Sequence, residues 1–205
     1  MSITYYYAPM STAERTTWAV EELGVPCERV KVDLKKKETK TEDFLKLNPN
    51  GLVPVLVVDG VPIFESTAIL LYLGETYGVE KGLYPAPGLK RAETLKWIIW
   101  ANVGFFEPLN RWARNKASYV PAEQHNAAAA AAAKDDLDTV MRVLDAALSG
   151  KNYLVDDKFS LADLATVSYL GWLQFMGYDY TKFENVKAWG ERCQARPAAV
   201  KVRGG

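Results

Sequence analysis

The sequence predicts an α/β half followed by an all-helical half, with boundaries at residues 1–79, 80–88 and 89–205. Three observations support this division. A β-favouring run, a helical pattern and a second β-favouring run follow one another at the spacing of a parallel β-α-β unit. Proline and glycine punctuate residues 82–88, which is typical of a connector between domains. The residues beyond this connector look helical.

The first half begins with the β-α-β unit. Ile3–Tyr7 is a short β-favouring run, and from Ser11 onward the apolar residues are spaced for one face of a helix. Gly24 is expected to stop this helix. Cys27–Val32 then alternates apolar and charged residues, which predicts a second strand.

A short helix, a hairpin and a further helix complete the first half. We expect the short helix over Glu42–Leu47. The dipeptide Asp59-Gly60 predicts the turn between strands Pro54–Val58 and Val61–Phe64. The pattern after Phe64 is helical again and stops near Gly78.

Pro54 stands at the start of an apolar, β-branched run. Because proline cannot donate to a sheet ladder, it belongs at the first residue of a strand, at an edge or at a bulge. The turn-forming segment Asn-Pro-Asn-Gly at residues 48–51 comes just before it. The sequence therefore predicts a special backbone arrangement between Val53 and Pro54.

The second half carries two clear helical signals. Apolar residues recur at intervals of three and four along one helix, with a single polar exception, at Leu95, Ile98, Asn102, Phe105 and Leu109. Ser160 and Asp163 fit an N-cap and its partner three residues later, so a buried helix is expected to begin there.

Two further features of this half have structural interpretations. We expect Pro121 to open a helix that contains the alanine run 127–133, since alanine is the best helix former. Cys193 is interpreted as a core thiol, and Cys27 has the same interpretation.

Composition excludes several classes of protein. The 25 basic and 25 acidic residues balance, whereas nucleic-acid-binding proteins usually carry a basic excess, so no nucleic-acid partner is expected. No stretch has the roughly 18 apolar residues of a membrane span. His125 is the only histidine, which argues against a metal site and against a Ser-His-Asp triad. Two distant cysteines and no signal-peptide pattern predict a cytoplasmic protein.

Several motifs, taken in order, resemble those of the cytosolic glutathione transferases. They are "YYYAPMSTAER", "NPNGLVPVL", "FESTAILLYL", the proline-rich connector and "FSLADLATVSYL", and together they cover nearly the whole chain. The resemblance implies a thioredoxin-like domain followed by a helical-bundle domain, and a homodimer. The serine near the start of the first helix is similar to that of the phi, delta and theta classes.

The resemblance also implies a glutathione site. In such proteins the proline is cis, and the main chain of Val53 before Pro54 would pair with the cysteine of glutathione. Glu65 would pair with the ammonium of the γ-glutamyl group, while Ser66 and the N–H groups of its helix would hold the carboxylate. Lys40 would reach the glycine carboxylate. Read without the resemblance, these are a strand-starting proline, two helix-capping residues and a solvated lysine.

The reacting residue is a hydroxyl donor in this interpretation, because the thiol of glutathione must become a thiolate. We rank Ser11 first and Tyr7 second, and Thr12 is a third candidate, at a position where beta-class enzymes carry a cysteine. Tyr6 would point to the opposite side of its strand. The local alternatives are an ordinary N-cap for Ser11 and a half-buried strand residue for Tyr7.

The predicted function is glutathione transfer to small hydrophobic electrophiles, with glutathione as co-substrate and no metal. The electrophile's pocket is expected between the domains, with Met10, Phe106 and Trp112 as candidates. One alternative is a non-enzymic assembly or binding module, similar to the transferase-like domain of an elongation factor subunit. We expect no appended domain here, which disfavours that role. Another alternative is a glutathione-dependent peroxidase, dehalogenase or isomerase.

Overall fold

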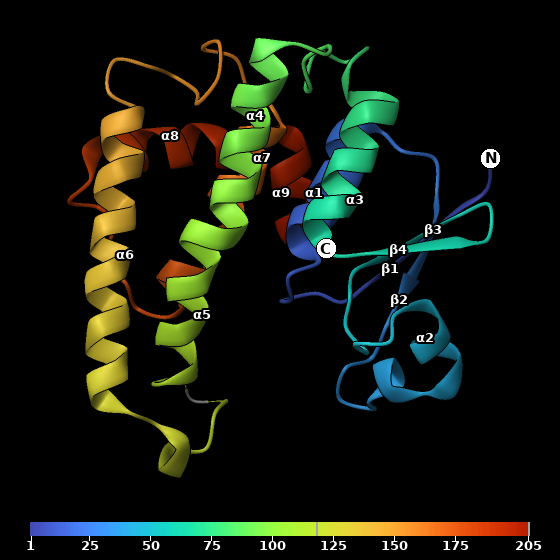
Figure 1. Ribbon diagram of the computed structural model, residues 1–205, viewed down its shortest axis with the longest axis horizontal. Helices are drawn as coiled ribbons and strands as arrows, with labels where there is room; N and C mark the ends of the chain where they lie inside the picture. The colour runs from blue at the N-terminus through green and yellow to red at the C-terminus, as the bar shows by residue number, and fades with distance from the viewer. Residues whose placement is uncertain (118, 205) are drawn as a thin grey trace. The chain divides into compact units, whose positions relative to one another are not determined.

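The computed structural model describes residues 1–117 and 119–204. They divide into two compact units, of which the first combines Met1–Ala86 with the C-terminal residues from Arg196 and the second is Pro87–Ala195 (Figure 1). An α/β unit and an all-helical unit confirm the predicted fold class. Among the described residues, no helix has the length and apolar character needed to cross a membrane.

The first unit is built on a four-stranded mixed sheet in the order β2-β1-β3-β4. Its strands are β1 (Ile3–Tyr7), β2 (Glu28–Lys31), β3 (Val55–Val58) and β4 (Val61–Phe64). β1 and β2 are parallel, and the other two pairings are antiparallel. This is the sheet of a thioredoxin-like domain, so both the β-α-β unit and the hairpin are confirmed.

Four α-helices lie among the described residues of this unit. They are α1 (Glu14–Leu23), α2 (Glu42–Leu47), α3 (Ser66–Leu73) and α9 (Pro197–Gly204). A π-helical segment, Gly74–Gly78, continues α3 to the glycine at which the pattern predicted its end. α1 and α3 pack side by side, and α9 packs against α1 (Figure 1).

Side chains of β1 alternate between the two faces of the sheet. The rings of Tyr5 and Tyr7 stack with centroids 5.6 Å apart, whereas the Tyr6 ring meets the edge of Phe44 in α2. Tyr5 is fully buried, and its hydroxyl lies 2.9 Å from the Ala13 carbonyl oxygen. The expectation that Tyr6 and Tyr7 point in opposite directions is confirmed.

α1 begins three residues later than predicted. The Ser11 carbonyl accepts a hydrogen bond from Glu14 N–H at 3.1 Å, and the Ser11 hydroxyl accepts one from Ala13 N–H at 3.1 Å. Residues 11–13 therefore form a turn in front of the helix, whose N-cap is Ala13. Serine competes with helical hydrogen bonding through its side chain, which explains why the helix does not start at Ser11.

Ion pairs fasten α9, and Arg196 just before it, to α1. The Glu22 carboxylate accepts from Arg196 Nε at 2.9 Å and also from its Nη2, and Glu21 accepts from Lys201 Nζ at 2.7 Å. Two consecutive carboxylates on α1 thus hold the last described helix in the first unit.

The second unit contains five α-helices among its described residues. They are α4 (Leu89–Trp100), α5 (Phe106–Arg114), α6 (Ala127–Ala147), α7 (Leu161–Phe175) and α8 (Glu184–Gln194), with a π-helical segment, Ala101–Phe105, between α4 and α5. α4 packs against α7, and α5 lies beside α6 (Figure 1).

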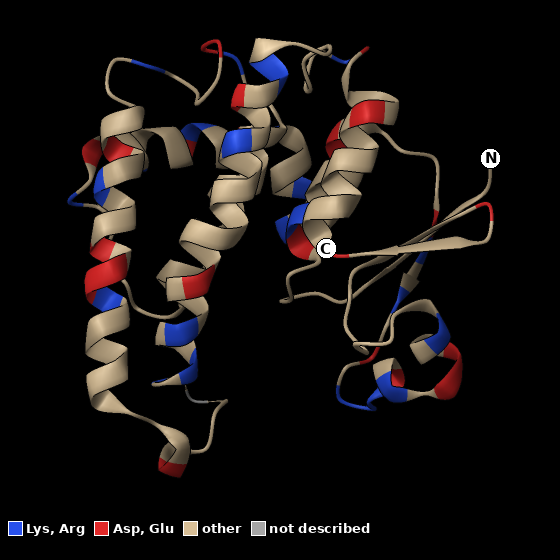
Figure 2. Cartoon of the chain, in the orientation of Figure 1, with Lys and Arg blue, Asp and Glu red and all other residues tan. Residues whose placement is uncertain are grey.

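The start of α6 corrects one prediction. Pro121 precedes only a short 3-10 turn, Ala122–Gln124, and the helix begins at Ala127. Its N-cap is Asn126, whose side chain accepts a hydrogen bond from Ala129 N–H at 3.0 Å. An asparagine cap satisfies a free helical N–H group, which proline cannot do. The alanine run forms the first turns of α6, an uncharged stretch in Figure 2.

Asp163 organises the start of α7. Its buried carboxylate accepts hydrogen bonds from Ser160 N–H and Ser160 Oγ at 3.0 and 3.1 Å, and from Leu154 N–H and Trp189 Nε1 at 2.9 Å each. Burial raises the pKa of the Asp163 carboxyl, while these hydrogen bonds oppose the shift. The predicted capping box of Ser160 and Asp163 is confirmed, and it extends to α8 through Trp189.

The cysteines differ in burial. Cys193 is fully buried in α8, which confirms the interpretation as a core thiol. Cys27 is only partly buried just before β2, so that interpretation was wrong for Cys27, since the edge strand leaves its start open to solvent.

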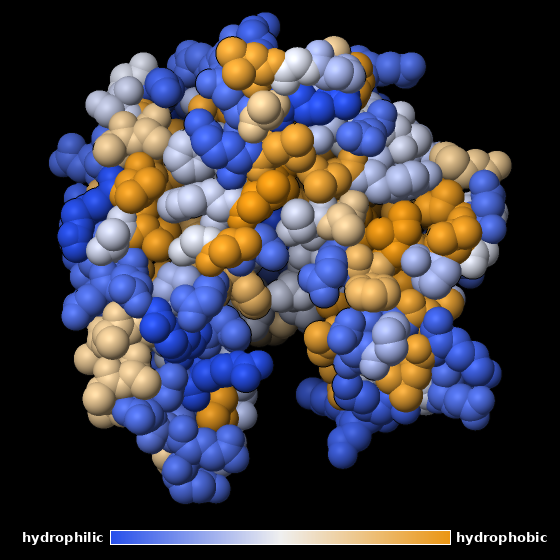
Figure 3. All heavy atoms as spheres, viewed as in Figure 1, coloured by the Kyte–Doolittle hydropathy of each residue, from blue (hydrophilic) through white to orange (hydrophobic). Residues whose placement is uncertain are grey.

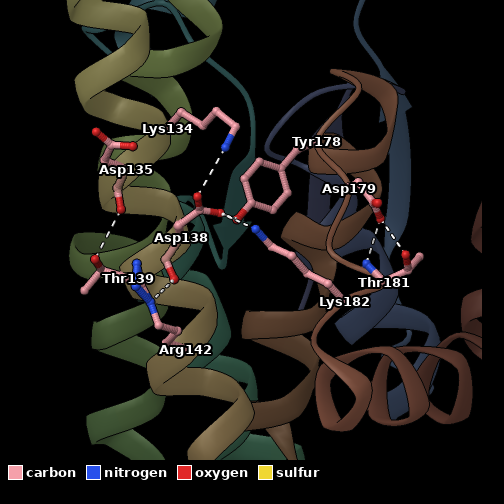
Figure 4. Close-up of polar contacts among 9 residues, drawn as sticks. All are labelled: Lys134, Asp135, Asp138, Thr139, Arg142, Tyr178, Asp179, Thr181 and Lys182. Atoms are coloured by element: carbon pink, nitrogen blue, oxygen red, sulfur yellow. Dashed lines mark hydrogen bonds and ion pairs between the residues drawn. The ribbon is translucent and has the colours of Figure 1, made fainter.

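A second polar cluster ties α6 to the segment before α8, as Figure 4 shows. The Asp138 carboxylate accepts hydrogen bonds from the Tyr178 hydroxyl and from Lys134 Nζ and Lys182 Nζ, both lysines at 3.2 Å. Burial raises the pKa of Asp138, but these three donors outweigh it and lower the pKa to about 2. Burial raises the pKa of the Tyr178 hydroxyl, and the hydrogen bond to the Asp138 carboxylate raises it further.

We predict that Asp138→Asn lowers the free energy of unfolding by about 1–2 kcal/mol at neutral pH. The contribution should be complete above the ordinary Asp pKa of 3.8 and should disappear as the pH falls toward about 2. Urea unfolding at a series of pH values measures this. Asp135→Asn, an exposed position on the same helix, is the control. An equal loss in both variants, or a loss that persists at the lowest pH, would contradict the prediction.

Candidate active site

The segments that carry the predicted site residues meet at one end of the sheet. In the hairpin, the first residue of β3, Val55, pairs with the last residue of β4, Phe64. Pro54 and Glu65, which come just before β3 and just after β4, are therefore neighbours at this end of the sheet. The Val53–Pro54 peptide bond is cis, as the resemblance implied. Pro54 thus precedes β3, where its missing N–H removes nothing from the ladder.

Val53 connects this segment to the loop between β1 and α1. Its carbonyl oxygen accepts a hydrogen bond from the Thr12 hydroxyl at 3.3 Å. Its N–H group has no hydrogen-bond partner among the described residues, although the residue is buried. Few backbone donors of buried residues lack a partner in a folded protein, so this N–H group is a candidate for binding a ligand.

Asn48 builds the turn that leads to Val53. Its amide nitrogen donates to the Leu52 carbonyl at 2.7 Å, and its amide oxygen accepts from Asn50 N–H at 3.0 Å. The side chain therefore bridges both arms of the turn. Asn48 is a positioning residue that the sequence reasoning missed, although the Asn-Pro-Asn-Gly segment was a signal for such an asparagine-stabilised turn.

Lys40 lies on the outside of the same turn. Its ammonium donates to the carbonyl oxygens of Asn50 and Gly51 at 3.1 and 3.0 Å. Lys40 is exposed to solvent, as the alternative interpretation expected, and its side chain also holds the turn by these two hydrogen bonds. The third N–H of the ammonium stays available to a ligand.

The start of α3 forms the opposite side of the site. Glu65 occupies the N-cap position with φ 71° and ψ 115°, a conformation that residues with a side chain rarely adopt. It gives no side-chain cap, so its carboxylate does not satisfy the helix. Strained backbone of this kind is typical of functional sites.

The first N–H groups of α3 are free. The first hydrogen bond inside the helix runs from Ile69 N–H to the Glu65 carbonyl at 3.0 Å, and Ser66 N–H and Thr67 N–H have no partner among the described residues. The Ser66 side chain is buried. An uncapped helix start with free donors attracts an anion such as a carboxylate, and a carboxylate beside it, on Glu65, attracts a cation.

The three candidate hydroxyls have different partners. Ser11 Oγ donates to the Ala8 carbonyl at 2.7 Å and accepts from Ala13 N–H, so it is oriented from both sides. Thr12 Oγ1 donates to Val53, as described above. Tyr7 stacks on Tyr5 and is only partly buried. Ser11 and Thr12 thus share a loop that is joined directly to the Val53 segment.

The candidates for the electrophile's pocket do not form one cluster within a unit. Met10 belongs to the first unit, has φ 52° and is 70% exposed. Trp112 is buried in the second unit, where its ring meets Tyr178 edge-on and Lys116 Nζ lies 4.2 Å from its centroid. Phe106 stacks on Tyr169 at 5.4 Å. The two aromatic residues are therefore explained by packing inside the helical unit.

Among the described residues, no three His, Cys, Asp or Glu side chains gather as they would around a metal ion.

Comparison with known proteins identifies the family. Residues 1–75 match the model of the glutathione S-transferase N-terminal domain, and residues 113–197 match that of the C-terminal domain. The chain is 31% identical over 194 residues to glutathione S-transferase GstB of Escherichia coli, which covers 94% of this chain and 92% of the relative. The chain belongs to the glutathione S-transferase superfamily.

Solved structures of this superfamily extend the comparison. A glutathione transferase homologue from Lodderomyces elongisporus, with two glutathione molecules per subunit, is 27% identical with a TM-score of 0.88 and covers 98% of this chain and 97% of its own. The nitrogen regulation fragment of the yeast prion protein Ure2p is 25% identical with a TM-score of 0.89 and covers 100% and 97%. Thus the transferase fold spans the chain, and one of its relatives is named for regulation.

A substitution at Gly51, in the turn before the cis-proline, tests whether the close contacts of this turn with Thr39 and Lys40 stabilise the protein. Gly51 has φ +60°, and a Cβ atom there would lie 2.6 Å from Lys40 Nζ and 2.8 Å from the Thr39 carbonyl oxygen. We predict that Gly51→Ala lowers the free energy of unfolding by about 2–3 kcal/mol, since strain and overpacking add.

Gly60→Ala is the matched control, because Gly60 also has a positive φ, of +86°, but no atom within 4 Å of a Cβ. It should lose only about 1 kcal/mol. Thermal or urea unfolding of both variants measures the difference. Equal losses would show that the contact with Lys40 and Thr39 does not matter.

Proposed function

We propose that this protein is a glutathione transferase, which binds glutathione at the edge formed by Val53, Pro54, Glu65 and Ser66 and activates its thiol with Ser11. The observation that carries the proposal is the start of α3, where an uncapped helix with free N–H groups adjoins the uncommitted Glu65 carboxylate. Superfamily membership and the glutathione bound in the Lodderomyces elongisporus homologue support it.

The residues present suit each part of glutathione. The γ-glutamyl end carries an ammonium and a carboxylate, and Glu65 and the start of α3 offer the opposite charge and the donors for these groups. The free N–H of Val53 suits a carbonyl oxygen of the peptide, in the manner of an added strand. Lys40, beside the same turn, suits the glycine carboxylate.

The chemistry requires a hydrogen-bond donor for the sulfur. Glutathione supplies a thiol, whose unperturbed pKa is about 8.5, and lowering the pKa by two units takes about 2.7 kcal/mol of thiolate stabilisation. A single hydrogen bond to a charged group supplies about 1.5–3 kcal/mol. One hydroxyl is therefore enough, and no general base is needed.

Ser11 meets this requirement best. Ala13 N–H fixes the Ser11 oxygen from one side, so rotation about the Cβ–Oγ bond alone turns its O–H group from the Ala8 carbonyl toward a thiolate sulfur, to which it then donates a hydrogen bond. The Thr12 hydroxyl would have to give up its bond to Val53, which itself belongs to the proposed site. Tyr7 is the second choice because it ends β1 on the side of α1. The thiolate would then attack a small hydrophobic electrophile.

A non-enzymic binding module is the second candidate. Two observations favour it: the likeness to the regulatory fragment of Ure2p, and the engagement of both the Ser11 and the Thr12 hydroxyl protons by carbonyl oxygens. A glutathione-dependent peroxidase, dehalogenase or isomerase would use the same glutathione site with a different second substrate.

We further propose a cytoplasmic homodimer. Cys27 and Cys193 form no disulfide among the described residues, which suits a reducing compartment. Leu89, Ile99 and Val103 of the second unit are at least half exposed, and Figure 3 shows apolar surface over α4. Contiguous exposed apolar side chains are typical of subunit interfaces. Analytical ultracentrifugation tests this directly.

Binding is tested by Glu65→Gln, which removes the charge proposed to hold the ammonium group. We predict that the Kd for glutathione rises about tenfold or more, because a charge-assisted hydrogen bond is lost. Isothermal titration calorimetry measures it. Glu80→Gln, an exposed residue of the same unit, should leave the Kd unchanged. Similar affinities in both variants would remove Glu65 from the site.

Catalysis is tested by Ser11→Ala. We predict a tenfold to thousandfold loss of kcat for conjugation of a small aryl halide, roughly as for the removal of one oxyanion-stabilising donor. The pKa of the bound thiol, followed by thiolate absorbance, should rise toward its free value, so the remaining activity should shift to higher pH.

Tyr7→Phe and Thr12→Val are the companion variants, and both should keep most of the activity. If either abolishes turnover while Ser11→Ala does not, the assignment of the hydroxyl is wrong. If the unchanged protein neither is retained on immobilised glutathione nor conjugates an aryl halide, the assembly module is the better account. Retention with turnover of a peroxide alone favours a peroxidase.

A further inference from the structure

A cavity of about 430 Å³ lies within the first unit, beside the loop that carries Ser11. The end of β1, α1, β2 and α9 surround it. Its apolar lining comes from Tyr7, Pro9, Met10 and Val202. This volume suits a small organic molecule, and an aromatic ring with neighbouring apolar groups suits a ligand with an apolar body.

The charges around this cavity do not balance. Four cationic side chains and two carboxylates line it, and they are Arg29, Lys31, Lys201, Arg203, Glu14 and Glu21. Glu21 accepts hydrogen bonds from Arg29 and from Lys201, and although burial raises its pKa, these two cations lower it overall. Burial raises the pKa of the Glu14 carboxyl, and the charge of Arg203 only partly opposes this shift. The lining thus keeps a positive excess.

We assign the excess positive charge of the lining chiefly to Lys31. It ends β2 and pairs in register with Tyr7, so the ammonium group and the aromatic ring belong to the same rim. Lys31 makes no ion pair with any described residue. A cation without a partner at the rim of an apolar cavity attracts an anion with an apolar body.

The cavity is joined to the proposed reacting group. Ala8 lines the cavity, and its carbonyl oxygen accepts the hydrogen bond from Ser11 Oγ at 2.7 Å. None of the residues proposed to hold glutathione, Val53, Glu65, Ser66 and Lys40, belongs to the lining. The cavity is therefore separate from the glutathione site and adjoins it at Ser11.

We propose that this cavity holds the electrophilic substrate and selects one that carries a carboxylate on an aromatic or other apolar body. Lys31 is the specificity-determining cation, and Tyr7, Pro9 and Met10 contact the apolar body. The inference rests on the proposed transferase function for its catalytic consequence. The selection of an apolar anion itself does not depend on that function.

The test compares two electrophiles that differ only in charge, a chlorodinitrobenzoate and its carboxamide. The thiolate displaces chloride from the same ring in both, with formation of a carbon–sulfur bond. Lys31→Gln should lower kcat/KM for the carboxylate about two- to fivefold relative to the carboxamide, as expected for an exposed charge pair. Lys31→Glu should lower it further, and the KM for glutathione should stay unchanged.

Lys35→Gln is the control, because Lys35 is an exposed lysine of the loop after β2 and lies outside the lining. The ratio of the two electrophiles should be unaffected by it. A ratio that does not move in Lys31→Gln overturns the proposal. A rise in the KM for glutathione with equal effects on both electrophiles also overturns it, since Lys31 would then belong to the glutathione site.

A binding measurement separates this proposal from the proposed function. Dinitrobenzoate, which has no leaving group, should bind more weakly to Lys31→Gln than to the unchanged protein by the same factor, in isothermal titration calorimetry. If conjugation is absent but this difference is found, the transferase proposal fails and the anion site remains. If conjugation is present but the difference is absent, the anion site fails.

Discussion

The first unit depends on one buried carbonyl oxygen, that of Ala13. It lies 2.9, 2.8 and 2.9 Å from the hydroxyl oxygens of Tyr5, Thr16 and Thr17, and it also accepts the helical hydrogen bond from Thr17 N–H. Because Tyr5 belongs to β1 and the threonines belong to α1, this group of bonds fixes where the helix begins relative to the sheet. The positions of Ser11 and Thr12, in the turn just before it, follow from that junction.

The second unit has a counterpart in the Asp163 carboxylate. It ties the segment before α7 to the start of α7 and, through Trp189, to α8. A buried charged group with several donors is costly to disturb, since removal of the carboxylate would leave those donors without partners. Each unit thus has a polar centre of its own that orders its helices.

The parts of the fold that rest on local pattern could be predicted from the sequence. Alternation predicted that Tyr6 and Tyr7 lie on opposite faces of β1, and the spacing of Ser160 and Asp163 marked a capping box. These signals succeed because the residues that interact are near in sequence. The boundaries at Ser11 and Pro121 failed because a serine side chain and an asparagine cap, at residues 11 and 126, decide them instead of the hydrophobic period.

Less of the candidate site than of the fold could be predicted from the sequence. The cis bond before Pro54 came from resemblance, whereas the place of Glu65 at the start of α3 came from the local pattern, and the structure agrees with both features of the backbone. The bridging amide of Asn48, the two carbonyls held by Lys40 and the contact between Thr12 and Val53 came only from the structure. Thr12 and Val53 are 41 positions apart, so only the folded structure brings them together, whereas the Asn48 and Lys40 contacts depend on the exact path of the turn.

The ion pairs that join the C-terminal segment to α1 show that the first unit is built from two segments that are far apart in the sequence. Glu22 and Arg196 are 174 positions apart, yet they lie in the same unit. The helical unit is therefore inserted in sequence between two segments of the α/β unit, Met1–Ala86 and the segment that begins at Arg196. A fragment encoding only residues 1–86 would retain the sheet but would lose a covering helix, so exchange of modules between relatives should preserve the terminal segment together with the first 86 residues.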